Sequence, residues 1–191
     1  MIQDLDDTLK ELLTQKLPIA NAAIDIRFEM PDKEWETRLT LSKPTINLFL
    51  YDIRENHDLR SNETFLSRNG TTGRETRAPA RLDLAYLISV WTKDIADEHR
   101  LLGNVLRTLL RYPILPPEVL KGEMVNQSLP LQAWIAQPER TPNMWDFWGG
   151  IDGRLKPGIS YMVTLAVETI APMEVDLVTA KVIRLGTRSE G

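Results

Sequence analysis

The chain has 191 residues, of which 42% are hydrophobic and 26% are charged, and its formal net charge at pH 7 is −4. This composition is typical of a folded globular protein and argues against disorder throughout, while the acidic balance argues against a general nucleic-acid binder or a cationic membrane-surface protein. The sequence contains no cysteine, which excludes a disulfide framework, a thiol nucleophile and a cysteine-bound zinc site.

The N-terminal segment does not read as a targeting signal. Acids at Asp4, Asp6 and Asp7 give it the wrong charge for a signal peptide. No apolar run in the sequence approaches the roughly 18 residues that a membrane-spanning helix needs. We therefore expect a protein that is made in the cytoplasm, stays soluble there and does not insert into a membrane.

Three elements are expected before residue 54. A helical stripe of leucines and Ile2 predicts an amphipathic helix that ends near Pro18. Apolar residues then alternate with charged ones from Ile24 to Met30, which predicts a strand with one wet face. After Pro44, the run from Ile46 to Ile53 is almost continuously apolar, so we expect a strand that is covered on both faces, near the middle of the sheet.

The next segment, residues 54–80, shows no periodicity and is predicted to form a long polar loop. Turn signals occur in it at Asn69-Gly70 and at Gly73. A connection of this length is uncommon in a compact domain, and such loops are usually functional or disordered.

A strand that leads almost directly into a helix is the clearest pattern in the chain. From Arg81 to Val90 every second residue is apolar, which places Asp83 and Ser89 on the opposite, polar face. Asp94 then predicts the N-cap of a helix that ends before Pro113. The predicted apolar stripe of this helix consists of Ile95, Leu102, Leu106 and Leu109.

The elements that follow are shorter. We expect a helical turn over residues 117–120, a short strand over 131–135, helical turns within 141–155 and a second clear strand over 161–167. The stretch 175–185 favours a strand, but its apolar residues fall on both faces, so its register is weakly set.

Together these elements predict an α/β (α+β) fold. Its centre is a single mixed, largely antiparallel sheet of about five strands, with the two main helices packed on it. Residues 1–191 are expected to form one domain that carries the long polar loop 54–80 and an extended C-terminal arm over residues 171–191.

The first candidate for chemistry is His99. It falls within the predicted apolar stripe, between Ile95 and Leu102, so we expect it to face the sheet as a satisfied core histidine. A small hydrolase or ligand-binding domain that uses His99 with Asp97 or Glu98 stays open as an alternative.

Other motifs for chemistry are weaker. His57 lies next to Asp58 without a partner at the spacing of a metal site or a catalytic triad. Gly70 and Gly73 lack the lysine and the preceding strand of a phosphate-binding loop. We therefore expect no catalytic residue, no cofactor and no metal.

Arginines are concentrated in the predicted loop and at its end. They are Arg54, Arg60, Arg68, Arg74, Arg77 and Arg81, set against Glu55, Asp58, Glu63 and Glu75. Arginine side chains suit carboxylates across an interface as well as phosphates. A solvated flexible loop and a partner-docking loop are equally supported, and docking makes Arg60, Arg68, Arg74 and Arg77 candidate interface residues. A nucleic-acid-binding adaptor is a further alternative, weakened because Phe65 is the only stacking aromatic there.

A second concentration is aromatic and includes Trp134, Trp145, Phe147 and Trp148. Core packing is the default interpretation. A subunit interface is the alternative, because tryptophan is over-represented at interface hot spots. In that case Trp145 and Trp148 are the candidate interface residues.

Several stretches in consistent order carry a family resemblance. They are Pro44–Tyr51, Arg81–Leu87, the segment from Trp91-Thr92 through Asp97–Gly103, and Trp145 ahead of Tyr161–Thr164. Together they resemble the cap, or tail-terminator, proteins of phage-tail-like contractile injection systems, a family long known only as a domain of unknown function.

The resemblance implies a structural protein without catalytic residues. It implies a six-fold ring of this chain that closes the distal end of an inner tube and its contractile sheath, with the tube and sheath proteins as partners. The particle would be either released or membrane-anchored. Ion pairs from the arginine-rich loop and strand addition at an open sheet edge are the docking contacts we expect.

Overall fold

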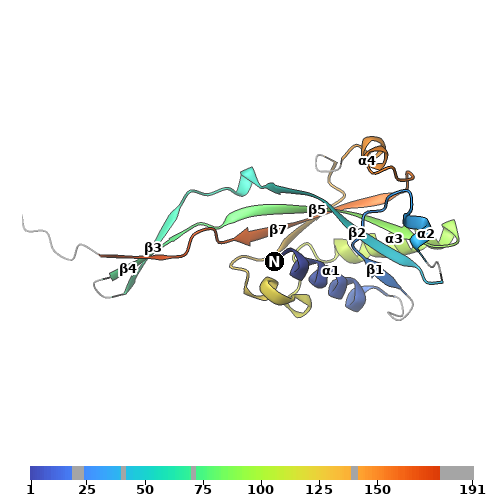
Figure 1. The fold of residues 1–191 in the computed structure, drawn as a ribbon. Coiled ribbons are helices and arrows are strands. Elements are labelled where there is room, and N and C mark those ends of the chain that lie inside the picture. The colour runs from blue at the N-terminus through green and yellow to red at the C-terminus, as the bar shows by residue number, and fades with distance from the viewer. Residues whose placement is uncertain (19–23, 40–41, 70–71, 139–141, 177–191) are drawn as a thin grey trace, which may run out of the picture.

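The computed structural model describes the chain except for residues 19–23, 40–41, 70–71, 139–141 and 177–191. Figure 1 shows two parts, which we call the body and the arm. The arm consists of β3 (Thr64–Asn69), β4 (Thr72–Arg77) and β8 (Met173–Asp176), and the body is the rest of the described chain. The arm projects from one end of the body, so the molecule is elongated.

The body is built on a five-stranded sheet in the order β1-β2-β5-β7-β6. β1 is parallel to β2, and the other three pairings are antiparallel, so the predicted mixed, largely antiparallel sheet is confirmed. The strands are β1 (Asp25–Arg27), β2 (Thr45–Glu55), β5 (Ala80–Trp91), β7 (Gly158–Val167) and β6 (Gln132–Ile135).

Two long helices cover one face of this sheet (Figure 1). α1 (Ile2–Lys16) and α3 (Ile95–Leu110) bury their leucines against inward side chains of β2, β5 and β7 in the main core. Short elements complete the body: α2 (Trp35–Arg38), α4 (Met144–Gly150), and the 3₁₀ helices η2 (His57–Leu59), η3 (Pro117–Val119) and η4 (Gly122–Asn126). The helical turns expected over residues 117–120 and within 141–155 are therefore present.

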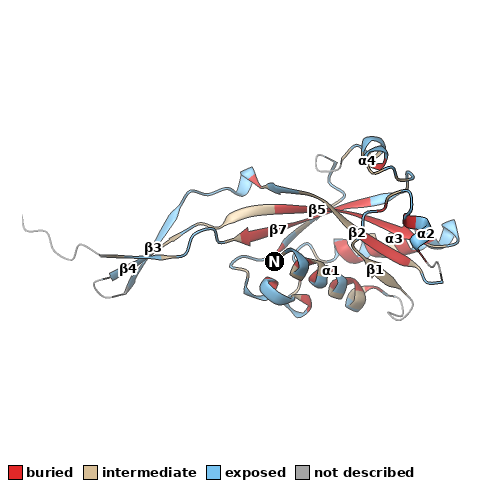
Figure 2. Cartoon of the chain, in the orientation of Figure 1, coloured by how far each residue is buried: buried red, intermediate tan, exposed pale blue. Residues whose placement is uncertain are grey.

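The opposite face of the sheet is also covered at one end, which corrects the expectation of a polar face on β5. Trp35 and Trp148 pack there against Leu87 and Trp91 in a second core cluster. Figure 2 accordingly shows β5 buried over most of its length. Ser89, which alternation placed on a polar face, is buried beneath this cluster and accepts a hydrogen bond from the Trp91 indole at 2.9 Å.

α3 begins where the sequence predicted, but the side of the helix that faces the sheet differs from the predicted one. The Asp94 carboxylate accepts hydrogen bonds from two backbone N–H groups of the first turn, as the N-cap prediction requires. The buried stripe, however, consists of Glu98, Leu101, Val105, Thr108 and Leu109. Ile95 is 72% exposed, and His99 is exposed rather than facing the sheet, so both of those expectations were wrong.

A buried ion pair explains why the side of α3 that carries Glu98, and not the side that carries His99, faces the sheet. Lys156 Nζ lies 2.5 Å from Glu98 Oε2, and both side chains are largely buried. The same Nζ sits 4.1 Å from the ring centroid of Trp91, which adds a cation–π contact. Lys156 comes from a loop far away in the sequence and neutralises Glu98. Glu98 can therefore be buried against the sheet, where the apolar periodicity had predicted His99.

Residues 54–80 are not the single polar loop that the sequence predicted. They contain the end of β2, the turn η2 and the β3–β4 hairpin, whose register runs from Thr64↔Arg77 to Asn69↔Thr72. β8 pairs with β4 and so forms part of the predicted C-terminal arm, but most of the predicted 175–185 strand lies outside the described residues. The expectation that the chain is one domain stays a prediction.

Candidate functional site

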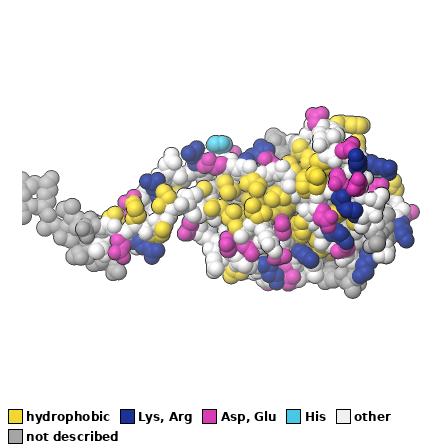
Figure 3. Space-filling view, in the orientation of Figure 1, with side chains coloured by type: hydrophobic (Ala, Val, Ile, Leu, Met, Phe, Trp, Pro, Cys, Tyr) yellow, Lys and Arg dark blue, Asp and Glu magenta, His cyan; other side chains and the backbone are white. Residues whose placement is uncertain are grey.

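The arm is a three-stranded sheet with almost no interior. Its order is β3-β4-β8, so β4 is central. Among the strand residues of the arm whose exposure is described, Gly73 alone is buried. Basic and hydrophobic side chains are interspersed along the surface of this projection (Figure 3). The arm therefore presents side chains to its surroundings rather than packing them into a core.

The strand register divides the arm into two faces. Because alternate residues of a strand point to opposite sides, the pairings place Leu66, Arg68, Glu75, Arg77 and Met173 on one face, which we call the basic face. The other face carries Phe65, Arg74 and Glu174. Arg74 and Glu174 are directly opposite each other in the β4–β8 register, so this face balances its positive charge. The basic face keeps a net positive charge.

Three of the four candidate arginines lie on the arm, and Arg74 among them is across from Glu174. Arg68, Arg74 and Arg77 are exposed, and none of them has an ion pair within the described part of the chain. Arg60 differs, because its Nε lies 3.4 Å from Glu55 Oε1 at the root of the arm. On the body, by contrast, ion pairs engage Arg27, Arg38, Arg54, Arg100 and Arg154. Free cations on a protruding element of an acidic protein suit an acidic partner.

A buried polar cluster anchors the arm to the body. Asn56 Nδ2 donates to both carboxylate oxygens of Asp83, at 3.1 and 3.0 Å, and Thr164 Oγ1 donates to Oδ1 at 2.6 Å. All three residues are buried. The cluster ties the end of β2 to β5 and β7, and the Asn56 side-chain oxygen also accepts from Leu59 N to cap η2. It thereby fixes the direction in which the chain leaves the body.

Sequence reasoning missed this cluster because it placed Asp83 on a solvated face. The available signal was an acid in the middle of an otherwise apolar strand. A buried carboxylate needs hydrogen-bond donors, and those come from residues far away in the sequence. The alternation alone could not identify them.

The two candidate tryptophans of α4 have opposite environments. Trp148 is 1% exposed and makes an edge contact with Trp91, with ring centroids 6.5 Å apart. Its assignment to an interface is therefore corrected to core packing. Trp145 is 75% exposed and remains a candidate contact residue. The sequence could not separate them, since both lie within one short helix.

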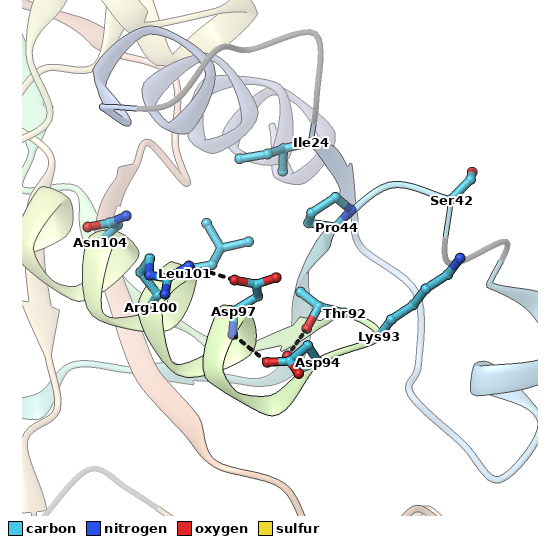
Figure 4. Close-up of a pocket in the computed structure, with 10 residues that line it drawn as sticks. All are labelled: Ile24, Ser42, Pro44, Thr92, Lys93, Asp94, Asp97, Arg100, Leu101 and Asn104. Carbon is cyan, nitrogen blue, oxygen red and sulfur yellow. Dashed lines mark hydrogen bonds and ion pairs between the residues drawn. The ribbon is translucent and has the colours of Figure 1, made fainter.

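A hollow of about 360 Å³ opens beside the first turns of α3, as Figure 4 shows. Its lining includes Asp94, Asp97 and Arg100 but not His99. Asp97 accepts a hydrogen bond from Arg100 at 2.6 Å, and Glu98 is held by Lys156. No bond joins His99 to either acid among the described residues. The hydrolase alternative therefore lacks an assembled acid–histidine pair.

The described residues hold no candidate metal cluster and no candidate membrane span. Nowhere among them do three or more histidine, cysteine, aspartate or glutamate side chains gather in a way that could hold a metal ion. Nor does any helix among them have the length and apolarity to cross a membrane.

Comparison with known proteins places the fold. The family model described as the Pvc16 N-terminal domain matches residues 4–179. A PVC sheath/tube terminator from an extracellular contractile injection system, in its extended state, superposes with a TM-score of 0.73 at 22% identity, over 99% of this chain and 64% of that chain. An anti-feeding prophage cap, described as a tube-terminating cap, gives a TM-score of 0.68 at 22% identity, over 97% and 62%.

The chain thus spans less than two thirds of the length of either of these structures. Among curated proteins, none matches this sequence. The expected tail-terminator fold is confirmed, and it includes the arm, because the first superposition covers nearly the whole chain.

Proposed function

Because the chain belongs to the Pvc16 N-terminal domain family, we propose that it is a structural cap of a contractile injection system, which closes the distal end of the inner tube and sheath and ends their growth. The observation that carries this proposal is the superposition of 99% of the chain on a sheath/tube terminator. The role requires surfaces that bind other subunits, and it requires no reaction.

The mechanism follows from the geometry of repeated contacts. Copies joined head to tail close into a ring when the rotation between neighbours closes, and we propose a ring of six. Stacked tube and sheath rings grow as long as the exposed end offers a complementary surface. A cap binds this end through one face and offers no copy of that surface on the other. Synthesis and assembly would take place in the cytoplasm, on a particle that is released or membrane-anchored.

We assign the docking role to the arm and to exposed Trp145. The arm reaches beyond the body, and its free cations can form ion pairs with acidic subunits of the particle. The hollow beside α3 is not needed for this role.

Deletion of the gene tests the cap function directly. Particles without this chain should lack density at one tip and show a broad distribution of lengths by electron microscopy, and added purified chain should restore both features. Particles of unchanged length and unchanged tips after deletion would overturn the proposal. Light scattering of the purified chain over a range of concentrations measures separately whether the ring forms before docking.

A charge-reversal variant tests the arm. Changing Arg68, Arg74 and Arg77 to Glu should abolish retention on particles while the free energy of unfolding stays close to that of the wild type, because these side chains are exposed and without ion pairs in the described structure. A matched control changes the exposed body lysines Lys10, Lys33 and Lys43 to Glu, which alters the net charge equally. Capping by the arm variant at the wild-type level would reject the docking role of the arm.

A further inference from the structure

A second hollow, of about 260 Å³, lies where the arm joins the body. Residues 78–79 connect β4 to β5 at this point (Figure 1), and we call the space the root hollow. Its lining comes from η2, β3, the linker 78–79, the start of β5 and residues 128–129 after η4. The root hollow is therefore built by the body and the arm together.

The walls of the root hollow are mainly apolar. Leu59, Phe65 and Leu129 line it, and all three side chains are exposed. Neither of the two core clusters includes any of them. A ligand that covers these side chains would remove apolar surface from water, which favours an apolar group in the hollow.

Arg81 gives the root hollow a positive charge. Among the described residues that line the hollow it is the one cation, and its side chain is half-buried. Its Nε is buried and has no hydrogen-bond partner, while the nearby acid Glu55 is engaged by Arg60 at 3.4 Å. A buried charged donor without an acceptor is unfavourable in the folded state. A ligand carboxylate would supply that acceptor, and the arginine fork suits its geometry.

The polar groups of the lining narrow the class of ligand further. Glu63 is exposed and opposes a second negative charge nearby, which favours a single carboxylate over a doubly charged phosphate. Ser61 and Ser128 are also exposed. Ser61 Oγ accepts a hydrogen bond from Glu63 N at 3.1 Å, so its hydroxyl proton can still be donated to a ligand. Two hydroxyls suit the main chain of a peptide better than a plain alkyl chain.

We propose that the root hollow binds the C-terminal residue of a partner polypeptide. The terminal carboxylate pairs with the Arg81 guanidinium, and an apolar side chain packs against Leu59, Phe65 and Leu129. Capture of a free chain end by its carboxylate is a known mode of peptide recognition. The bound chain end would contact the body and the arm at once and so hold the arm in place. This inference goes beyond the cap function and does not depend on it.

Three small probes test the site on the purified full-length chain. They are acetyl-Ala-Ser-Leu with a free C-terminal carboxylate, the same peptide as its C-terminal amide, and isocaproate, which has the carbon skeleton of leucine without a peptide chain. Titration is followed by the amide NMR shifts of Ala78, Arg81 and Leu129. The peptide acid should bind at least about tenfold more tightly than the amide, because it alone offers a charge-assisted hydrogen bond. Isocaproate should bind more weakly than the peptide acid.

Substitutions in the lining separate binding from folding. Arg81→Met should abolish the preference for the acid without lowering the free energy of unfolding, because it removes an unpartnered buried donor. Arg111→Met, at an exposed position outside the lining, changes the net charge equally and should keep the preference. Leu129→Ala should weaken binding about fivefold, whereas Val125→Ala, exposed and outside the lining, should not. Glu63→Gln should strengthen binding of the acid and leave the amide unchanged.

Four results would overturn the inference: no binding of the peptide acid at millimolar concentration, equal affinity for acid and amide, an unchanged preference in Arg81→Met, or isocaproate binding as tightly as the peptide. If Arg81→Met fails to fold, Glu63→Gln and Leu129→Ala provide the test, since both positions are exposed. None of these measurements involves particle tips or lengths, so failure here is distinct from failure of the cap function.

Discussion

The body and the arm of this protein are both built from strands, but the body buries its strands and the arm exposes them. In the body, β5 is buried along most of its length between two helices on one face and an aromatic cluster on part of the other. In the arm, β3 and β4 expose most of their described side chains, including Phe65 and Leu66, and β3 is exposed throughout its described part (Figure 2). Among the described residues, ion pairs engage most body arginines, whereas none engages Arg68, Arg74 or Arg77.

This contrast shows which part of the molecule carries the stability of the fold. A small sheet without a hydrophobic face is marginal in isolation, so the arm depends on the body to hold its shape. The Asp83 cluster at its root provides that support. The apolar and cationic side chains of the arm add little to folding, which leaves them available for a partner.

The largest expected effect lies in the body, where removal of an indole from the second core cluster should lower the free energy of unfolding most. Trp148→Ala should lower the free energy of unfolding by about 3 to 5 kcal/mol, because it leaves a cavity beside Trp91. Trp145→Ala, on the same helix, should change it by less than about 0.5 kcal/mol. Denaturant titration of both variants measures the difference, and equal effects would contradict the assignment of Trp148 to the core.

The next effect lies at the junction of the two parts. Asp83→Ala leaves the buried donors of Asn56 and Thr164 without their acceptor, so we expect a loss of about 2 to 3 kcal/mol. Amide exchange should also become faster in the arm than in β7. Asp52→Ala, which removes a surface acid paired with Arg54, should cost less than about 1 kcal/mol. Unchanged exchange in the arm would show that the cluster does not support it.

A smaller effect concerns the pH dependence of the body. Burial raises the pKa of the Asp6 carboxyl above its ordinary value of 3.8, and the hydrogen bond from the Tyr86 hydroxyl, 2.8 Å long, opposes this shift in part. The folded state therefore binds the proton more tightly than the unfolded state. Stability from this group is present below the unfolded pKa and is lost as pH rises through the folded pKa.

Asp6→Asn removes this titration and keeps an oxygen that can accept from Tyr86. The stability of the wild type minus that of the variant should fall as pH rises from about 4 to about 7, measured by denaturant titration at each pH. Asp7→Asn, at an exposed neighbouring position, serves as the control. A difference that rises with pH would contradict the burial of Asp6.

The smallest effect is expected in the arm. Leu66→Ala should change the free energy of unfolding by less than about 1 kcal/mol, because half of the side chain is already exposed. The matched deletion Leu84→Ala in β5, which is fully buried, should cost about 2 to 5 kcal/mol. Similar losses of unfolding free energy for Leu66→Ala and Leu84→Ala would contradict the conclusion that the body has a hydrophobic core and the arm has none.

Local patterns predicted much of the body. The leucine stripe identified α1, the N-cap at Asp94 identified the start of α3, and alternation identified β5 and β7, because each signal depends only on residues close together in the sequence. The five-stranded sheet followed from combining them. The concentration of arginines singled out residues 54–80, but the sequence predicted a loop there and not the β3–β4 hairpin.

The sequence by itself therefore determined most elements of the body, the concentration of arginines in residues 54–80 and the family to which the chain belongs. Tertiary structure alone decided which side of each element is buried and which is exposed. Lys156 turned α3 so that Glu98 is buried and His99 exposed, and pairing with β8 made a sheet of a segment that lacks a periodic core pattern. The physical reason is that burial and pairing depend on partners brought together by folding, and these partners lie far away along the chain.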